Sequence, residues 1–280
     1  MKIALITPLK DEINNIARFL KSVSDQTIEI HCLVIVENDS TDGSIAYLDQ
    51  IKHVENVKHF EVINLTFEDK SYDLGFKYSK VVSDGFDHLK SLEGYEELDY
   101  LGILDCDCFP EPDYFKKLVD FMEANPEVGI SSGLIFTDEG KPHIANPNWV
   151  RGGCRLWKKA CFEDTGFPVE PSPDAITVAL AHIHGWKAKT LKTAKVISRE
   201  VNVRMNIFKI QGERTHYRGN SFIYAALKGL NYAFRKKRPK VGWDYFIGYT
   251  ESMLKKKPRI KDERIINYYK NYLTNKIFNL

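Results

Sequence analysis

Two aspartates one residue apart, Asp105 and Asp107, are the residues of this sequence best suited to chemistry. They follow the apolar run 101–104 directly and precede a proline-rich turn. Such a run predicts a buried strand, and ligands bind beyond the carboxyl ends of strands in an open α/β sheet. Carboxylate oxygens suit Mg²⁺ or Mn²⁺, whose other ligands are usually water and substrate phosphates. The spacing therefore favours a metal-bound diphosphate, with both aspartates as metal ligands.

A structural role for the aspartate pair stays open, because acidic residues after a strand often cap the next helix. Cys106 and Cys108 alternate with the aspartates, but the other three cysteines are scattered and complete no zinc-type spacing. We interpret all five as buried thiols. Cysteines without a framework also favour a reducing compartment.

The composition is that of an ordinary globular protein, with 280 residues of which 43% are hydrophobic and 28% charged. No window reaches the roughly 18 consecutive apolar residues of a membrane span. The apolar run at the N-terminus is too short for a signal peptide and predicts a strand. We expect a cytoplasmic protein, peripheral on the cytoplasmic face of the membrane.

The net charge of +2 conceals an uneven distribution. From Arg199 to the C-terminus, 19 Lys and Arg residues stand against 6 Asp and Glu residues, a net charge of +13, whereas the preceding residues carry −11. Such asymmetry indicates an anionic partner, with a merely solvated helix face as the alternative. Aromatic residues within 222–249 lie in helical stretches bounded by basic clusters, which favours an anionic membrane surface over nucleic acid.

Strands and helices alternate over the first 200 residues. Strands are predicted at 2–6, 30–36, 60–65, 100–104, 128–136, 148–157, 186–191 and 194–201. Helices are predicted at 12–24, 45–51, 75–89, 115–124, 171–184, 222–234 and 243–254. The alternation predicts a doubly wound, mainly parallel sheet flanked by helices, with the polar loops gathered at one edge.

Four short motifs occur in the order and at the intervals of family 2 glycosyltransferases. They are Thr7-Pro-Leu-Lys-Asp-Glu12, Val36-Glu-Asn-Asp-Ser-Thr-Asp42-Gly-Ser, Leu104-Asp-Cys-Asp107 and Pro173-Asp174. The chain resembles that family over about residues 1–200. The segments 211–219 and 259–270 resemble, more loosely, the carboxyl-terminal part of bacterial and archaeal members that build exopolysaccharides or other surface glycans.

The resemblance implies the glycosyltransferase A fold and an inverting transfer of a sugar. The donor is a nucleotide-diphosphate sugar, and the acceptor is a hydroxyl of a glycan or lipid-linked glycan. It divides the chain into a nucleotide-sugar-binding catalytic domain, 1–204, and a basic, aromatic-rich helical appendage, 205–280, at the membrane interface or on the acceptor side.

The resemblance also implies residue roles. Asp107 is the direct metal ligand, and Asp105 reaches the metal through water or holds the ribose. Asp174 is the catalytic base, although a helix start equally suits an N-cap. Residues expected to bind the donor are Thr7, Pro8, Glu12, Glu37, Asn38, Asp42, Lys77 and Asp105. Arg151, Gly152 and Gly153 also belong to the substrate site and are expected on its acceptor side, because glycine allows close backbone approach. His182 and His184 are structural, with metal or diphosphate contact as the alternative.

The sequence departs from the family pattern in the second motif. Glu37 and Asn38 stand where the family often has two aspartates, the second of which contacts the nucleotide base. An amide both donates and accepts, whereas a carboxylate only accepts, so the identity of the base stays open. The first motif departs too, with Asp11 before Glu12 where asparagine is common.

The chemistry of glycosyl transfer requires the same groups, independently of the family resemblance. Charge developing on a departing diphosphate is stabilised by a divalent cation, and the attacking hydroxyl needs a general base. A nucleotidyltransferase would share the sheet and the carboxylates, but its first loop should be glycine-rich, and residues 7–12 contain no glycine. A non-catalytic protein that acts through its basic tail is a third hypothesis, which the intact carboxylates argue against.

Overall fold

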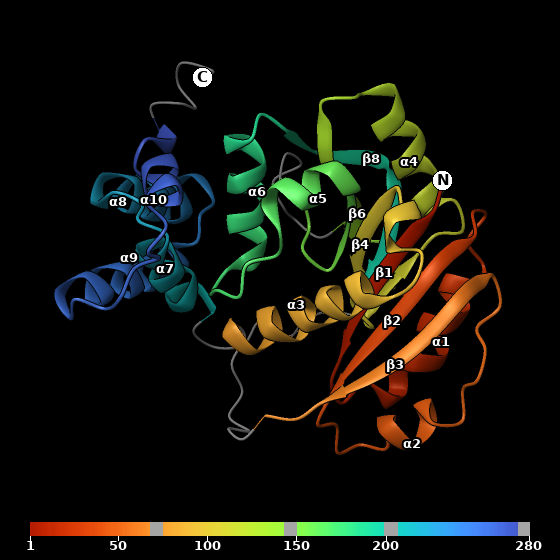
Figure 1. Cartoon of the computed structure of the whole chain (residues 1–280). Helices are drawn as coiled ribbons and strands as arrows, with labels where there is room; N and C mark the ends of the chain where they lie inside the picture. Colours follow the sequence, from red (N-terminus) through yellow and green to blue (C-terminus); the bar gives the residue numbers. More distant parts are fainter. Residues whose placement is uncertain (68–74, 143–149, 199–206, 274–280) are drawn as a thin grey trace. The chain divides into compact units, whose positions relative to one another are not determined.

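The computed structural model describes residues 1–67, 75–142, 150–198 and 207–273 (Figure 1). The chain forms two compact units, one of residues 1–169 with 184–200 and one of residues 170–183 with 201–280. The predicted boundary at 204 and 205 lies outside the described residues. The segment 170–183 groups with the C-terminal unit.

The described part of the first unit contains an eight-stranded sheet in the order β3-β2-β1-β4-β7-β6-β8-β5. The strands are β1 (Ile3–Leu9), β2 (Ile30–Asn38), β3 (Val57–Leu65), β4 (Tyr100–Leu104), β5 (Cys108–Pro110), β6 (Val128–Phe136), β7 (Cys154–Lys158) and β8 (Lys187–Ser198). Strands β3, β2, β1 and β4 are mutually parallel, and β6 is parallel to β8. Strand β7 is antiparallel to β4 and β6, and β5 is antiparallel to β8. The predicted mainly parallel α/β fold is confirmed.

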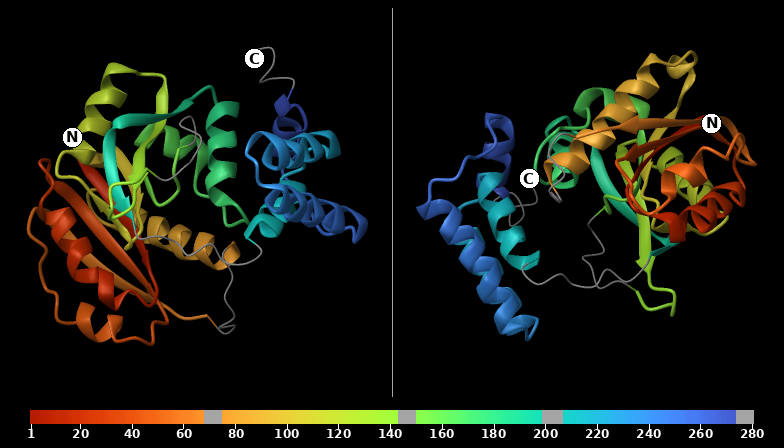
Figure 2. Two further views of the ribbon diagram at one scale, coloured as in Figure 1. Left: turned by 180° about the vertical axis from the view of Figure 1, so that it is seen from behind. Right: turned by 90° about the horizontal axis from the view of Figure 1, so that it is seen from below.

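Helices cover both faces of this sheet (Figure 2). They are α1 (Ile13–Ser24), α2 (Ser44–Leu48), α3 (Phe76–Ser91), the 3₁₀ turn η1 (Tyr95–Glu97), α4 (Tyr114–Ala124) and α5 (Lys159–Thr165). Ile3 and Leu5 of β1 join the core shared with α1 and α4. A Cβ on Gly85 of α3 would lie 2.6 Å from the Ile6 side chain. Alternate residues of β1 therefore pack against opposite layers, as strand geometry requires.

Strands β1 and β2 run past their predicted ends at residues 6 and 36. Pro8 pairs with Val36, and Leu9 pairs with Glu37. Strand β4 accompanies β1 only as far as Ile6, so Pro8 has a strand neighbour on one side, where a missing amide is tolerated. The predicted separate strands 186–191 and 194–201 are wrong, because β8 is one continuous strand.

The predicted strand 148–157 is also shorter in the structure. Strand β7 begins at Cys154, residues 150–153 precede it outside any strand, and residues 143–149 lie outside the described residues. The short elements β5, η1 and α5 were not predicted, and neither were the second-unit helices 207–217 and 263–270.

The second unit is helical in its described residues. Its elements are α6 (Pro173–Ile183), α7 (Ile207–Tyr217), α8 (Phe222–Leu230), the π-helical turn η2 (Asn231–Arg235), α9 (Pro239–Leu254) and α10 (Glu263–Lys270). None of the described helices is both long enough and apolar enough to cross a membrane.

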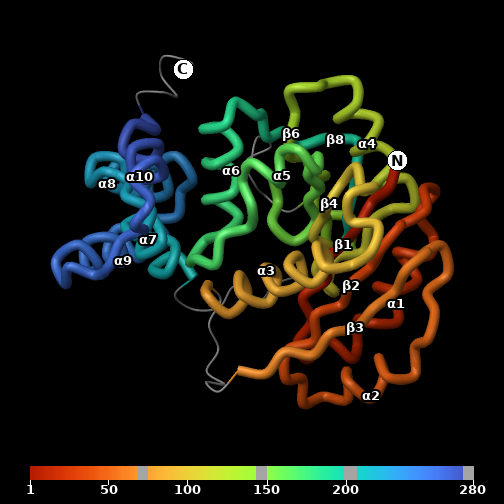
Figure 3. Tube along the Cα trace, in the orientation of Figure 1, coloured from red at the N-terminus to blue at the C-terminus, as the bar shows by residue number. Residues whose placement is uncertain are grey.

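Glycines let the helices of the second unit pack closely, and α7 lies along α9 (Figure 3). A Cβ on Gly212 of α7 would lie 2.0 Å from the Tyr245 carbonyl oxygen, and one on Gly248 would lie 2.0 Å from the Lys209 carbonyl oxygen. Helix α9 also buries Tyr245 and Tyr249 in the core of this unit. Backbone contact therefore replaces side-chain interdigitation along this helix pair.

Gly248→Ala is expected to destabilise the second unit by about 1–3 kcal/mol, because its methyl group would meet backbone that cannot move independently. The higher helix propensity of alanine offsets only part of this. The midpoint of urea unfolding followed by circular dichroism measures the effect. Lys240→Ala, at an exposed position of the same helix, is the control and should change stability by less than about 0.5 kcal/mol. Equal midpoints for the two variants would contradict the packing argument.

Candidate functional site

Asp105 and Asp107 lie in a tight turn directly after β4, at the carboxyl edge of the parallel strands. The Cys108 amide donates to the Asp105 carbonyl oxygen at 2.9 Å and closes this turn. The Tyr78 hydroxyl, at the start of α3, donates to Asp105 Oδ1 at 3.0 Å. Asp107 Oδ1 lies 3.7 Å from the Cys108 thiol. Both aspartates directly follow a strand, as predicted, while their role as a pair of metal ligands stays a prediction.

The Asp105 carboxylate packs directly against Gly153. Leu104 pairs with Cys154 in the antiparallel ladder, and the Asp105 amide donates to the Gly153 carbonyl oxygen at 2.8 Å. A Cβ on residue 153 would lie 2.0 Å from Asp105 Oδ2. Only glycine allows this position of the carboxylate. The space beside Gly153, expected to receive a ligand, is thus occupied by Asp105, while acceptor-side roles for Arg151 and Gly152 stay predictions.

Asp42 joins the loops that follow β1 and β2. Its Oδ2 accepts a hydrogen bond from the Ile13 amide at 2.9 Å, and its Oδ1 accepts from the Ser44 amide and hydroxyl at 3.0 and 2.6 Å. Burial raises the pKa of Asp42, but these hydrogen bonds outweigh burial and hold the pKa below its ordinary value. The visible role of this carboxylate is to fasten the starts of α1 and α2, and its contact with a donor stays a prediction.

Lys10 and Asp11 strengthen the same connection, which the sequence did not reveal. Lys10 Nζ donates to the carbonyl oxygen of Asn38 at 2.9 Å. Asp11, whose φ is 53°, accepts from the Thr41 amide at 2.7 Å. The signal for this turn in the first motif is the aspartate itself, which adopts a left-handed backbone conformation more readily than most residues.

The other residues of the first two motifs that are predicted to bind the sugar donor lie at or just after the ends of β1 and β2. Glu37 is buried, and its Oε1 accepts from the Ser40 amide at 2.6 Å. Glu12 Oε2 accepts from the Asn15 side chain at 2.5 Å. The hydroxyl oxygen of Thr7 is buried and has no hydrogen-bond partner among the described residues. A buried hydroxyl in this state can hydrogen-bond to a ligand or an ordered water.

Two arginines line the start of β7. The Arg151 amide donates to Ser132 Oγ at 2.9 Å, and burial lowers the pKa of the Arg151 guanidinium, against the influence of nearby thiols. Arg155 is fully buried, with Nε 2.8 Å from the Arg151 carbonyl oxygen and its guanidinium 5.3 Å from the Trp157 ring centre. An arginine inside an apolar strand was the available signal for Arg155, and it was missed.

Lys77 and Tyr78 stand in the first turn of α3. Lys77 Nζ lies 6.0 Å from the Phe67 ring centre. Tyr78 was not predicted, although it follows the predicted Lys77 and reaches Asp105. A tyrosine in a helix carries no spacing signal for a contact with a strand 27 residues later, so only the fold identifies it.

The cysteines are buried and free, as predicted. Burial raises the pKa of Cys154 to about 12 and that of Cys108 well above its ordinary value. Thiols in this state do not supply thiolate ligands.

Asp105 and Asp107 fit a hard divalent cation through the chemistry of their oxygens. Within the described ranges, no group of three or more His, Cys, Asp or Glu side chains could hold a metal. A pair of carboxylates suits Mg²⁺ or Mn²⁺, which keep waters and take substrate phosphates as further ligands.

Asp174 belongs to the second compact unit. Helix α6 begins at Pro173, so Asp174 is its second residue, and the Ser172 carbonyl accepts from the Ala175 amide at 3.1 Å. Asp174 therefore stands inside the first turn, where a carboxylate interacts favourably with the helix dipole. Farther along, His182 Nδ1 lies 2.7 Å from the Tyr268 hydroxyl, which fits its predicted structural role.

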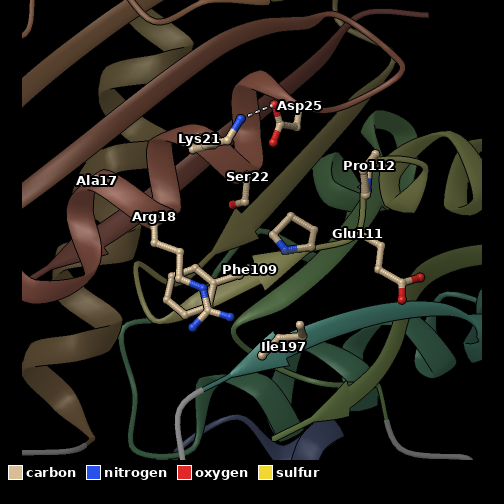
Figure 4. Close-up of a pocket in the computed structure, with 10 residues that line it drawn as sticks. Ala17, Arg18, Lys21, Ser22, Asp25, Phe109, Glu111, Pro112 and Ile197 are labelled. Atoms are coloured by element: carbon tan, nitrogen blue, oxygen red, sulfur yellow. Dashed lines mark hydrogen bonds and ion pairs between the residues drawn. The ribbon is translucent and has the colours of Figure 1, made fainter. Parts of the chain in front are cut away.

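A pocket of about 620 Å³ opens on the first unit between α1 and residues 109–112 (Figure 4). The Arg18 guanidinium lies 4.0 Å from the Phe109 ring centre and pairs with Asp138 at 2.6 Å. No predicted site residue lines this pocket. We therefore assign it no role in the chemistry of the carboxylates.

Gly153→Ala is expected to destabilise the first unit by about 1–3 kcal/mol, because the new methyl group overlaps the Asp105 carboxylate. In an Asp105→Ala background the same substitution should cost much less, since the overlapping atoms are gone. Urea unfolding of both single variants and the double variant gives the coupling between the two positions. An equal cost in both backgrounds would show that the contact is not responsible.

Known structures resemble the chain at low sequence identity. S. aureus TarS 1–349 in complex with UDP-GlcNAc shares 15% identity, with 84% of this chain and 73% of that chain covered and a TM-score of 0.57. The mannosyltransferase PcManGT from Pyrobaculum calidifontis, in complex with GDP-Man and Mn²⁺, shares 13% identity, with 99% and 75% covered and a TM-score of 0.54. The chain covers 44% of a longer S. aureus TarS structure, less than half of its length.

At these identities the likeness establishes the fold, which is the predicted glycosyltransferase A fold. The family model "Glycosyl transferase family 2" matches residues 4–176. This range covers more than half of the chain and includes the four motifs. The chain is therefore a glycosyltransferase and belongs to glycosyl transferase family 2.

Proposed function

We propose that the protein is an inverting, metal-assisted glycosyltransferase. It transfers a sugar from a nucleotide-diphosphate sugar to a hydroxyl of a glycan or lipid-linked glycan. The carrying observation is the turn that presents Asp105 and Asp107 together at the carboxyl edge of β4 in a chain of this family. The donors in the similar structures, UDP-GlcNAc and GDP-Man, support a nucleotide sugar, and Mn²⁺ in one of them supports a divalent cation.

Asp107 would hold the cation directly, and Asp105 would reach it through water or bind the ribose. When bound, the cation supplies a Lewis acid that stabilises charge developing on the donor diphosphate. Tyr78 and Gly153 fix the Asp105 carboxylate from two sides. A carboxylate held in this way needs little rearrangement when the donor arrives, which favours catalysis through preorganisation.

The nucleoside of the donor would lie over the ends of β1 and β2, near Thr7, Pro8 and Glu12. Glu37 is already engaged by the Ser40 amide. Lys10 holds the backbone of Asn38. The side-chain amide of Asn38 can both donate to and accept from a nucleotide base. We therefore assign base recognition to Asn38 rather than Glu37, with Lys77 near the diphosphate.

Asp174 would act as the general base that takes the proton of the acceptor hydroxyl. Direct displacement with inversion requires this base on the face of the sugar opposite the departing diphosphate. The family match favours this chemistry over nucleotidyl transfer. The acceptor side is assigned to Arg151 and Gly152, and the basic C-terminal helices to an anionic membrane surface, with no nucleic-acid partner.

Asp107→Asn is expected to abolish the metal dependence of donor binding, because a neutral amide neither balances the cation nor replaces a carboxylate as a hard ligand. Calorimetry with UDP-GlcNAc and GDP-Man, in Mn²⁺ and in chelator, measures it. Wild type should bind its donor roughly tenfold or more tightly with Mn²⁺, and Asp105→Asn should lose less of this gain.

Asp113→Asn, at a half-buried carboxylate in the loop after β5 that pairs with Lys117, is the control and should bind like wild type. Equal affinities of wild type with and without Mn²⁺, for a donor that does bind, would refute the metal assignment.

Asp174→Asn is expected to lower turnover by roughly 10²- to 10⁴-fold, the usual contribution of a positioned general base. Its shape is nearly unchanged, so donor affinity and melting temperature should be preserved. Asp262→Asn is the matched control, because Asp262 caps α10 by accepting from the Arg264 amide at 2.9 Å and should tolerate asparagine. Turnover of the Asp174 variant within a few-fold of wild type would remove Asp174 from the mechanism.

A further inference from the structure

The exposed apolar side chains of the second unit gather on one side of a continuous helical segment. Phe222, Ile223, Leu227 and Leu230 of α8 and Phe234 of η2 are between 46% and 77% exposed. At α-helical spacing the four positions in α8 fall within an arc of about 140°, and Phe234 follows in the π-helical turn. The opposite side of α8 is buried, and a Cβ on its Gly229 would lie 3.2 Å from the α9 backbone. We call these five exposed residues the apolar face.

An exposed basic run follows the apolar face directly in the chain. It consists of Arg235, Lys236, Lys237, Arg238 and Lys240, and none of these side chains forms an ion pair with any part of the chain that the structure describes. Trp243, the fifth residue of α9, is 64% exposed. A basic run that forms no ion pair among the described residues therefore adjoins an exposed apolar face, of which Phe222 also contacts the Phe246 ring of α9.

The aromatic side chains of the basic tail do not all face outwards, contrary to what the sequence pattern suggested. The sequence pattern grouped all aromatics of 222–249, yet Tyr245 and Tyr249 are core residues. Lys228 also turns inwards, with its ammonium group 5.0 Å from the Tyr245 ring centre, and burial lowers its pKa to about 8. The aliphatic side chains of α8, rather than these tyrosines, are available to a partner.

We propose that the apolar face, the basic run 235–240 and Trp243 together dock on an anionic lipid bilayer. Helices with one apolar side and flanking Lys and Arg lie in the plane of a membrane interface. Basic residues are attracted by anionic headgroups, and tryptophan favours the headgroup level. This inference rests on the membrane assignment made with the proposed function, and it names the residues of the second unit that carry it.

Charge complementarity selects a bilayer over a second copy of the chain. A symmetric dimer through this face would bring two basic runs of five residues together, which like-charge repulsion opposes. An anionic bilayer offers acyl chains to the apolar face and phosphates to the basic run at the same time.

The test is flotation of the full chain with vesicles of phosphatidylcholine, with or without phosphatidylglycerol, at low and high salt. One variant carries Ile223→Gln, Leu227→Gln and Leu230→Gln, and its control is Ile45→Gln on the first unit. A second variant carries Arg235→Gln, Lys236→Gln, Lys237→Gln and Arg238→Gln. Its control replaces four exposed lysines of the first unit with Gln: Lys52, Lys58, Lys189 and Lys192.

Wild type should float with anionic vesicles at low salt and much less at high salt. Each charge removed from the basic run should lower the partition coefficient about fivefold, which corresponds to about 1 kcal/mol. The apolar variant should lose on the order of tenfold, and both controls should float like wild type. Donor binding by the variants should be unchanged, which separates this test from that of the proposed chemistry.

Absence of any preference for anionic vesicles at low salt would overturn the proposal. So would variants that float as their controls do. A wild-type dimer in light scattering that becomes a monomer in the apolar variant would identify a second copy as the occupant of this face, and would overturn the proposal as well.

Discussion

The Asp105 carboxylate lies where a side chain on residue 153 would otherwise stand, and the candidate site depends on this contact. It exists because β7 runs antiparallel beside β4, so that the residue before β7 meets the residue after β4. The parallel strands on the other side of β4 supply the edge at which loops gather. The reversal of one strand thus places glycine at the one position where the carboxylate needs room.

The loops around that edge are held by charged groups that bind backbone. Asp42 fastens the starts of two helices, and Lys10 and Asp11 join the segments that follow β1 and β2. Hydrogen bonds between charged groups and backbone are stronger than those between neutral groups. A polar edge built in this way keeps its shape without a ligand, which lowers the conformational cost of binding one.

The second unit reaches its stability by different means. Its helices approach through glycines, and its tyrosines form the core between α7 and α9. Glycines occupy the contact between α8 and α9, and the large apolar side chains of α8 lie on its exposed side. A small helical unit therefore combines a well-packed interior with an unusually apolar and basic surface.

From the sequence alone, the alternation of apolar runs determined the sheet. The order of four motifs determined the family resemblance, and the carboxylate pair after one strand marked the edge at which a site is proposed. These features are local, because strand periodicity and the residues after a strand are written in neighbouring positions. The division into a negatively charged body and a basic tail was equally visible.

Only the tertiary structure decided what lies against what. Tyr78 and Gly153 meet Asp105 from segments 27 and 48 residues away, and no periodicity connects them. Likewise, the pattern of the tail could not tell Tyr245, which is buried, from Trp243, which is exposed two residues earlier. Which side of a helix faces inwards depends on the packing of its neighbours, so composition predicted the charge of this unit and the fold alone selected its exposed face.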